Sequence, residues 1–179
     1  MRVLSVKQPW AGLAMAGVKR FEVRPWRPSP ERGLLLLHAS SGTATGLRVD
    51  EKEPLYWSAL EQAEMPNRKA WPRSAILGVI EIRRVWHSGR RPKLMKLDRV
   101  MCGSTEGQAL WEIGRRWDFA TPVPCGGQLH FWPIPEERGR AVSSQIARLD
   151  LPDILWLQNY VQNVGATGNI GNKVNREHG

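Results

Sequence analysis

The sequence contains little cysteine and no long apolar run, and each absence excludes a class of protein. Cys102 and Cys125 are the only cysteines among 179 residues, and neither has partners at metal-ligand spacing. We therefore expect no zinc site and a reducing, cytoplasmic location. The longest apolar candidate, residues 34–37, is far shorter than the roughly 20 residues that span a membrane. The first residues also lack the apolar core of a signal peptide, so we expect neither export nor a membrane partner.

Acidic residues are scarce relative to basic ones, with 17 aspartates and glutamates against 26 lysines and arginines, for a net charge of +9. The excess is concentrated in two segments. Residues 2–27 carry six basic side chains and only Glu22 as an acid, and residues 83–99 carry seven against Asp98 alone. Such patches favour a polyanionic partner, nucleic acid first. The alternative is that the charge only keeps a small protein soluble.

The length suits one domain with a core and some peripheral elements. Apolar periodicity, glycine and proline predict strands over residues 2–6, 19–23, 33–39, 74–86 and 128–132, and helices over residues 9–16, 52–65, 105–117 and 152–164. A basic loop is expected over residues 87–99. This order predicts an α+β fold, a compact β-barrel decorated by helices. We divide the chain into a barrel domain, residues 1–135, a C-terminal helical extension, residues 136–164, and a disordered tail, residues 165–179.

A dense group of opposite charges follows the first predicted helix. Gly17 ends that helix, and Lys19, Glu22 and Arg24 come within the next seven residues. In an extended chain Lys19 would share a face with Phe21, so Lys19 and Glu22 can converge only if Lys19 still lies in the turn. The three charges predict either the floor of a polar site or an ion-pair network that braces the helix–strand junction.

Three segments together resemble the ASCH domain, a branch of the PUA-like barrels. They are Leu4-Ser5-Val6-Lys7-Gln8-Pro9-Trp10-Ala11, the pattern Gly-x-Lys-x-x-Glu-x-Arg over residues 17–24, and Gly33-Leu34-Leu35-Leu36-Leu37-His38-Ala39-Ser40. Later segments, residues 76–81 and 126–132, resemble an inner and a closing strand of that family. The resemblance implies a barrel of five or six strands whose cleft is lined by the motif. It also implies a link to RNA metabolism and transcription coactivation. Relatives in the wider PUA-like group bind RNA or modified bases.

A cleft that accepts one base needs a flat face for stacking and polar groups for the base edge. Trp10 could supply the face, Glu22 an acceptor, and Lys19 and Arg24 donors. His38 and Ser40, at the end of an apolar strand, are further candidates for ligand binding, although a histidine there is also typical of a core. Phosphate contacts are expected from the second basic segment: Arg83, Arg84, Arg90, Arg91, Lys93 and Lys96.

An enzyme is the alternative, because some ASCH proteins resemble acetylcytidine amidohydrolases, and ribonuclease activity is a related possibility. Lys19 and Glu81 would then be the catalytic residues. Those relatives carry threonine where this chain has Glu22, and a carboxylate there favours the charged, less nucleophilic lysine. Glu81 stands in an apolar strand and needs a partner, for which Lys19, Arg24 or Arg83 are available. A second alternative is a protein–protein adaptor that uses the C-terminal helix.

The sequence thus predicts a monomeric nucleic-acid-binding domain without metal or cofactor. Its ligand would be single-stranded RNA, in preference to DNA, or a modified nucleoside.

Overall fold

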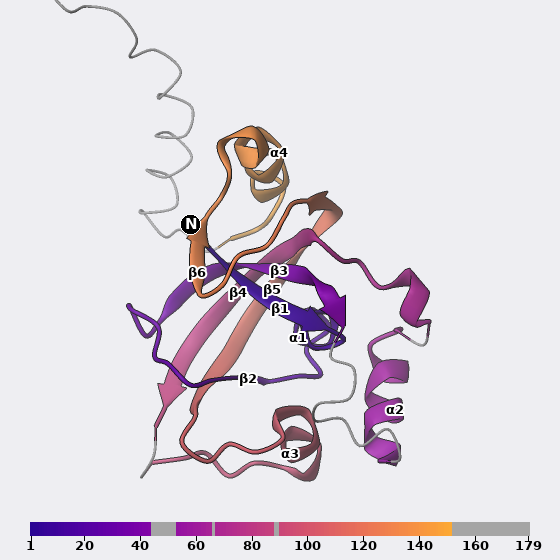
Figure 1. Ribbon diagram of the computed structural model, residues 1–179, viewed down its shortest axis with the longest axis vertical. Helices are drawn as coiled ribbons and strands as arrows, with labels where there is room; N and C mark the ends of the chain where they lie inside the picture. Colours follow the sequence, from indigo (N-terminus) through magenta and orange to yellow (C-terminus); the bar gives the residue numbers. More distant parts are fainter. Residues whose placement is uncertain (44–52, 66, 88–89, 152–179) are drawn as a thin grey trace, which may run out of the picture.

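The fold is one mixed sheet of six strands with helices around it (Figure 1). The computed structural model describes residues 1–43, 53–65, 67–87 and 90–151. The strands are β1 (Arg2–Gln8), β2 (Phe21–Arg24), β3 (Gly33–Thr43), β4 (Ala75–Trp86), β5 (Ala109–Pro124) and β6 (Phe131–Pro133), in the order β2-β5-β4-β3-β1-β6. The α-helices are α1 (Trp10–Met15), α2 (Pro54–Gln62), α3 (Lys96–Cys102) and α4 (Glu136–Ile146). The predicted α+β barrel is confirmed.

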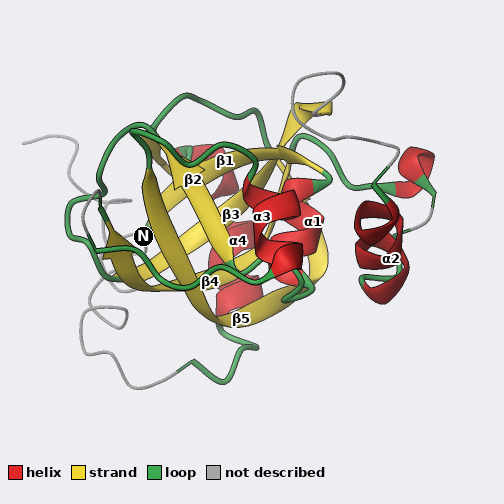
Figure 2. Cartoon of the chain, turned by 90° about the horizontal axis from the view of Figure 1, so that it is seen from below, coloured by secondary structure: helices red, strands yellow, loops and turns green. Residues whose placement is uncertain are grey.

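The sheet curls around its own core and stays open along one line (Figure 2). β1 and β3 are parallel, and the other strand pairs are antiparallel. The edge strand β2 pairs with β5 but not with β1, although the curl brings these two strands together. The result is a half-barrel with a seam between β1 and β2.

The apolar run at residues 34–37 shows why the sheet has a core on both faces. Leu35 and Leu37 lie in the cluster inside the barrel, and Leu34 and Leu36 lie in the cluster on the other face, under α4. All four side chains are at most 5% exposed. Each contributes on the order of 1.5–3 kcal/mol by leaving water. The strand is therefore buried on both of its faces.

The end of α1 positions the charged motif. Gly17 adopts φ 80°, Val18 N–H donates to the Leu13 carbonyl (3.0 Å), and Gly17 N–H donates to the Ala14 carbonyl (3.2 Å). This pair of hydrogen bonds ends a helix on a left-handed glycine. Because of this turn, Lys19 precedes β2, which begins only at Phe21. The condition that Lys19 must lie in the turn is therefore met.

Three sequence predictions need correction. Residues 105–117 do not form a helix, because β5 begins at Ala109 and pairs with β4 over most of its length. The expected basic loop contains α3, whose Asp98 binds Arg20 with its side chain. The closing strand begins at Phe131 rather than at residue 128. The helix predicted over residues 152–164 and the tail after it lie outside the described residues.

Candidate functional site

A cavity of about 500 Å3 lies at the seam between β1 and β2. The Arg24 guanidinium crosses the seam and donates a hydrogen bond to the Ser5 carbonyl (2.7 Å). The walls come from β1, the start of α1, β2, the end of β3 and the segment before β6. The lining residues are Ser5, Val6, Lys7, Trp10, Glu22, Val23, Arg24, Ser40, Ser41, Gly127, Gln128, Leu129 and His130. We call this cavity the seam pocket.

Glu22 and two cations form the charged floor of the seam pocket. The Glu22 side chain is 9% exposed, and its two oxygens lie 3.4 Å from Lys19 Nζ and 2.8 Å from Arg24 Nε. Lys19 lies behind the wall, where its ammonium group also donates to the Phe21 carbonyl. A carboxylate this buried requires compensating charge, and here it has two partners. The arrangement holds an anionic acceptor at a fixed place in the pocket.

Two polar atoms of the seam pocket have no hydrogen-bond partner among the described residues. They are the Ser40 hydroxyl and Arg24 Nε, both of which are buried. Arg24 Nε is close to Glu22 but not aligned for a hydrogen bond. Such groups are usually satisfied in a folded protein. The Ser40 hydroxyl is therefore open to a hydrogen bond, whereas Arg24 Nε keeps its ion pair with Glu22.

Trp10 forms one side of the seam pocket. It is the first residue of α1, and its ring packs edge-on against Tyr56 with 6.3 Å between the ring centroids. The indole is half-buried and lines the pocket. The structure therefore brings four of the predicted ligand-binding residues together at one cavity: Trp10, Glu22, Arg24 and Ser40.

The segment over residues 127–130 forms the wall that the sequence analysis missed. Leu129 is 87% exposed, and His130 adopts a positive φ of 55°. The Trp26 ring packs against His130, with centroids 5.3 Å apart, and against Phe131, with centroids 5.0 Å apart. The adjacent glycines at its start, Gly126 and Gly127, were the available signal, because they favour a turn rather than a strand.

His38 does not line the seam pocket. It is fully buried, and its Nδ1 lies 3.1 Å from Ser5 Oγ while its Nε2 lies 2.9 Å from the Cys125 carbonyl. Trp132 Nε1 donates to the same Ser5 hydroxyl (3.0 Å). Burial lowers the pKa of His38, although the bond to the carbonyl acts in the opposite direction. These contacts make His38 part of the support behind the pocket wall.

Glu81 is also separate from the seam pocket, and its partner is not one of the three that the sequence suggested. Its carboxylate accepts hydrogen bonds from the Arg115 backbone N–H (3.0 Å) and the Arg115 guanidinium (3.2 Å). The backbone bond is the main cause of the lowered pKa of Glu81, and the ion pair adds to it while burial opposes it. The structure does not place Glu81 in contact with Lys19.

Residues 4–113 match the family model of the ASCH domain, more than half of the chain. The chain belongs to the ASCH domain family. It is similar to "Activating signal cointegrator 1" from Homo sapiens, with 35% identity over 80 residues, and to the protein of that name from Mus musculus, with 34% identity over 80 residues. Each match covers 44% of this chain and 13% of the relative, so the chain corresponds to a small part of those proteins.

The second basic segment of this ASCH protein is mostly exposed. Arg83 and Arg84 lie on β4, Arg90, Lys93 and Lys96 follow it, and all five side chains are exposed. Arg91 differs, because it is half-buried and donates to the Gln108 carbonyl (2.8 Å). It anchors the segment rather than presenting a free charge.

α3 is held against β2 by the ion pair of Arg20 and Asp98. Burial of Asp98 favours its neutral form, but hydrogen bonds from Arg20 and from the Met95 N–H outweigh this and lower its pKa. α3 is therefore fixed beside the edge strand that carries Glu22 and Arg24, toward the bottom of Figure 1.

The described part of this ASCH protein shows neither a cluster of metal ligands nor an activated thiol. No group of three or more His, Cys, Asp or Glu side chains is arranged there to hold a metal ion. Burial raises the pKa of both Cys102 and Cys125, which disfavours the reactive thiolate. Among the described residues, no helix has the length and apolar character needed to cross a membrane.

Proposed function

We propose that this ASCH protein binds single-stranded RNA, or a modified nucleoside, with one base in the seam pocket. The observation that carries the proposal is the pocket itself. It combines an indole ring, a buried carboxylate, a guanidinium and a hydroxyl that has no hydrogen-bond partner among the described residues, around about 500 Å3. This volume falls within the range of about 300–1,000 Å3 that is typical of small-molecule pockets. The family's link to RNA agrees with this ligand class.

Each group has a role that follows from its contacts. Trp10 offers a π-face for stacking, which is worth about 1–3 kcal/mol per base in single-strand binding. A carboxylate offers roughly four acceptor sites, of which Lys19 and Arg24 occupy part. Glu22 can therefore still accept a hydrogen bond from an exocyclic amino group. The Ser40 hydroxyl can serve a base oxygen or the sugar.

The exposed cations of residues 83–96 are proposed to contact phosphates on either side of the bound base. They are Arg83, Arg84, Arg90, Lys93 and Lys96. We omit Arg91 from this set because the Gln108 carbonyl occupies its guanidinium. We take the protein as a monomer and RNA as preferred over DNA.

The test is the affinity for a short single-stranded RNA, measured by fluorescence anisotropy over a series of salt concentrations. The logarithm of the affinity should fall with the logarithm of salt, with a slope of about −0.7 per neutralised phosphate. Glu22→Gln should weaken binding with little change in slope, because Glu22 contacts the base. Salt-independent binding would reject the phosphate contacts, and an unchanged affinity for E22Q would remove Glu22 from the site.

A matched pair of double variants separates a specific surface from general charge. Arg83→Gln with Arg84→Gln should reduce both affinity and slope. Arg138→Gln with Arg140→Gln removes the same charge from exposed positions on α4, which lies at the top of Figure 1, away from the lower end of β4 that carries Arg83 and Arg84. Equal losses from the two pairs would mean that net charge alone attracts RNA.

The hydrolase alternative has weaker support in the geometry. Lys19 is engaged by Glu22 and the Phe21 carbonyl, and Glu81 binds Arg115 outside the pocket. Incubation of the protein with RNA that carries an acylated cytidine, followed by mass spectrometry, tests it directly. Deacylation or cleavage that disappears in Lys19→Ala would establish an enzyme. The adaptor alternative relies on residues 152–164, which lie outside the described residues.

A further inference from the structure

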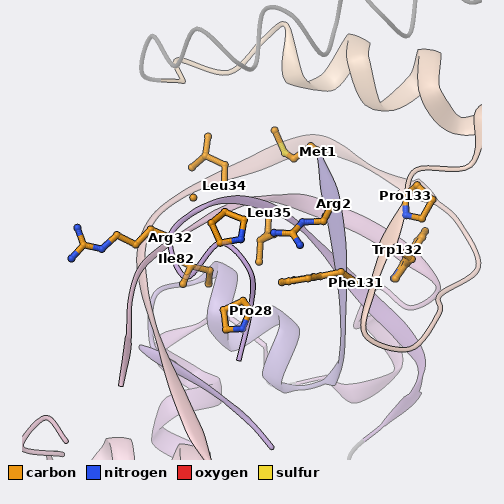
Figure 3. Close-up of a pocket in the computed structure, with 12 residues that line it drawn as sticks. Met1, Arg2, Pro28, Arg32, Leu34, Leu35, Ile82, Phe131, Trp132 and Pro133 are labelled. Atoms are coloured by element: carbon orange, nitrogen blue, oxygen red, sulfur yellow. The ribbon is translucent and has the colours of Figure 1, made fainter. Parts of the chain in front are cut away.

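A second, larger cavity of about 690 Å3 lies at the end of the barrel opposite α1 (Figure 3). The parallel strands β1 and β3 both begin at this cavity, and α1 follows the other end of β1. Leu35 and Ile82, two side chains of the interior cluster, contribute to its lining. We call it the end pocket. It shares no lining residue with the seam pocket.

The walls of the end pocket are almost entirely hydrocarbon. Besides Leu35 and Ile82, they include Leu34, Pro28, Pro30 and Pro133. No aspartate or glutamate among the described residues lines it. Prolines and aliphatic side chains offer no side-chain donor or acceptor for the edge of a base, so these walls suit a hydrocarbon chain better than a nucleobase.

The charged side chains of the end pocket are two arginines with different placements. The Arg2 guanidinium lies over the Phe131 ring, 4.2 Å from its centroid, among the pocket residues (Figure 3). Arg2 is half-buried and has no ion pair with any described carboxylate. Arg32 is exposed and extends away from the cavity (Figure 3). A half-buried guanidinium without a carboxylate beside a hydrocarbon wall is a site for an anion that carries an apolar chain.

We propose that the end pocket binds a medium-chain aliphatic monocarboxylate, with its chain along Leu35 and Ile82 and its carboxylate on Arg2. The N–H edge of the Arg2 guanidinium can donate to both carboxylate oxygens while its flat face remains on Phe131. Each methylene that leaves water should improve affinity about fourfold. This proposal does not depend on RNA binding.

Calorimetric titration of the whole protein with decanoate, decanol and decyltrimethylammonium compares three ligands that share a ten-carbon chain and differ in the charge of the headgroup. Decanoate should bind at least tenfold more tightly than decanol, and the cationic compound should bind least. Octanoate should bind about 16-fold more weakly than decanoate, since it lacks two methylenes. This comparison uses only the wild-type protein, so it does not depend on whether a variant folds. Equal affinity for all three headgroups, or no binding of any, would overturn the proposal.

Matched arginine variants locate the carboxylate. Arg2→Gln should remove the preference for decanoate over decanol, and Arg32→Gln should keep it although it loses the same charge. Methyl resonances of Leu35 and Ile82 should shift on addition of decanoate and identify the cavity. A preference that survives R2Q, or methyl signals that do not move, would overturn the assignment. So would displacement of decanoate by a nucleoside monophosphate, which would make the cavity a nucleotide subsite.

Discussion

Arg24 donates a 2.7 Å hydrogen bond to the backbone carbonyl of Ser5, and this contact spans the seam that leaves the barrel open between β2 and β1. The same guanidinium lies 2.8 Å from a Glu22 oxygen. One side chain therefore links the edge strand to the opposite wall and also neutralises the pocket carboxylate. Stability and ligand binding should both depend on it.

Arg24→Met should lower the free energy of unfolding by about 1.5–3 kcal/mol, the usual contribution of a hydrogen bond to a charged group. Urea denaturation measures the loss. Arg24→Lys should recover only part of it, because an ammonium group cannot reproduce the guanidinium fork that faces both Ser5 and Glu22. Arg83→Met, at a 61% exposed side chain, is the control and should have little effect. A full recovery in R24K would show that charge alone matters.

Lys19 and Glu22 should be strongly coupled in stability. Lys19→Met leaves the buried Glu22 with Arg24 as its remaining ionic partner among the described residues, and loss of a buried partner costs on the order of 3 kcal/mol. Glu22→Gln added to this variant should restore part of the loss, because the uncompensated charge is gone. A double-mutant cycle by denaturation should give a coupling energy of about 0.5–3 kcal/mol. If the losses of stability in the two single variants simply added up in the double variant, the Lys19–Glu22 ion pair would not contribute to stability.

Gly127→Ala should damage the seam pocket, whereas Gly126→Ala should not. A Cβ at Gly127 would lie 2.5 Å from His38 Cε1 and 2.9 Å from Ser5 Oγ, while a Cβ at Gly126 would have no neighbour within 4 Å. The segment must then move away from its support, at a cost of about 1–3 kcal/mol. Nucleoside affinity and thermal unfolding of the two variants give the comparison. Equal behaviour would mean that the wall shifts without consequence.

His38 should make stability depend on pH below neutrality. Burial lowers its pKa in the folded state below the usual 6.5, so the unfolded chain takes up a proton first as the pH falls. Its contribution is therefore complete above pH 6.5 and is lost as the pH falls below that value, by at most about 1.4 kcal/mol per pH unit. Denaturation at several pH values should show a steeper slope below pH 6.5 in the wild type and in His130→Gln than in His38→Gln, which keeps the contribution of the Met1 ammonium, whose pKa is lowered to about 5. The same slope in H38Q would assign it elsewhere.

The sequence predicted the elements whose determinants are local. Gly17 ends α1 through its own backbone conformation, and the apolar run at residues 34–37 requires a strand buried on both faces. The sequence made the approach of Lys19 to Glu22 conditional on this turn, and the turn is present. These features depend on a few adjacent residues, so they can be derived without the rest of the fold.

The failures concern features that only strand pairing decides. In residues 105–117, Leu110, Ile113 and Trp117 have helix-like spacing, but the register of β5 against β4 shifts between Ile80 and Ile82 and again between Ile82 and Arg84. Such irregularities break the alternation that identifies a strand. The partner of Glu81 depends on this same register, which places the Arg115 N–H beside its carboxylate. Neither result can be read from residues close in sequence.

Residues 127–130 line the seam pocket, and the next three residues, Phe131 to Pro133, line the end pocket. One short stretch of backbone is thus a partition with a cavity on each side. If a ligand in one cavity displaces this partition, the affinity of the other cavity must change by the same factor in both directions, because thermodynamic coupling is reciprocal. Two chemically unrelated ligands would then compete or cooperate without ever touching.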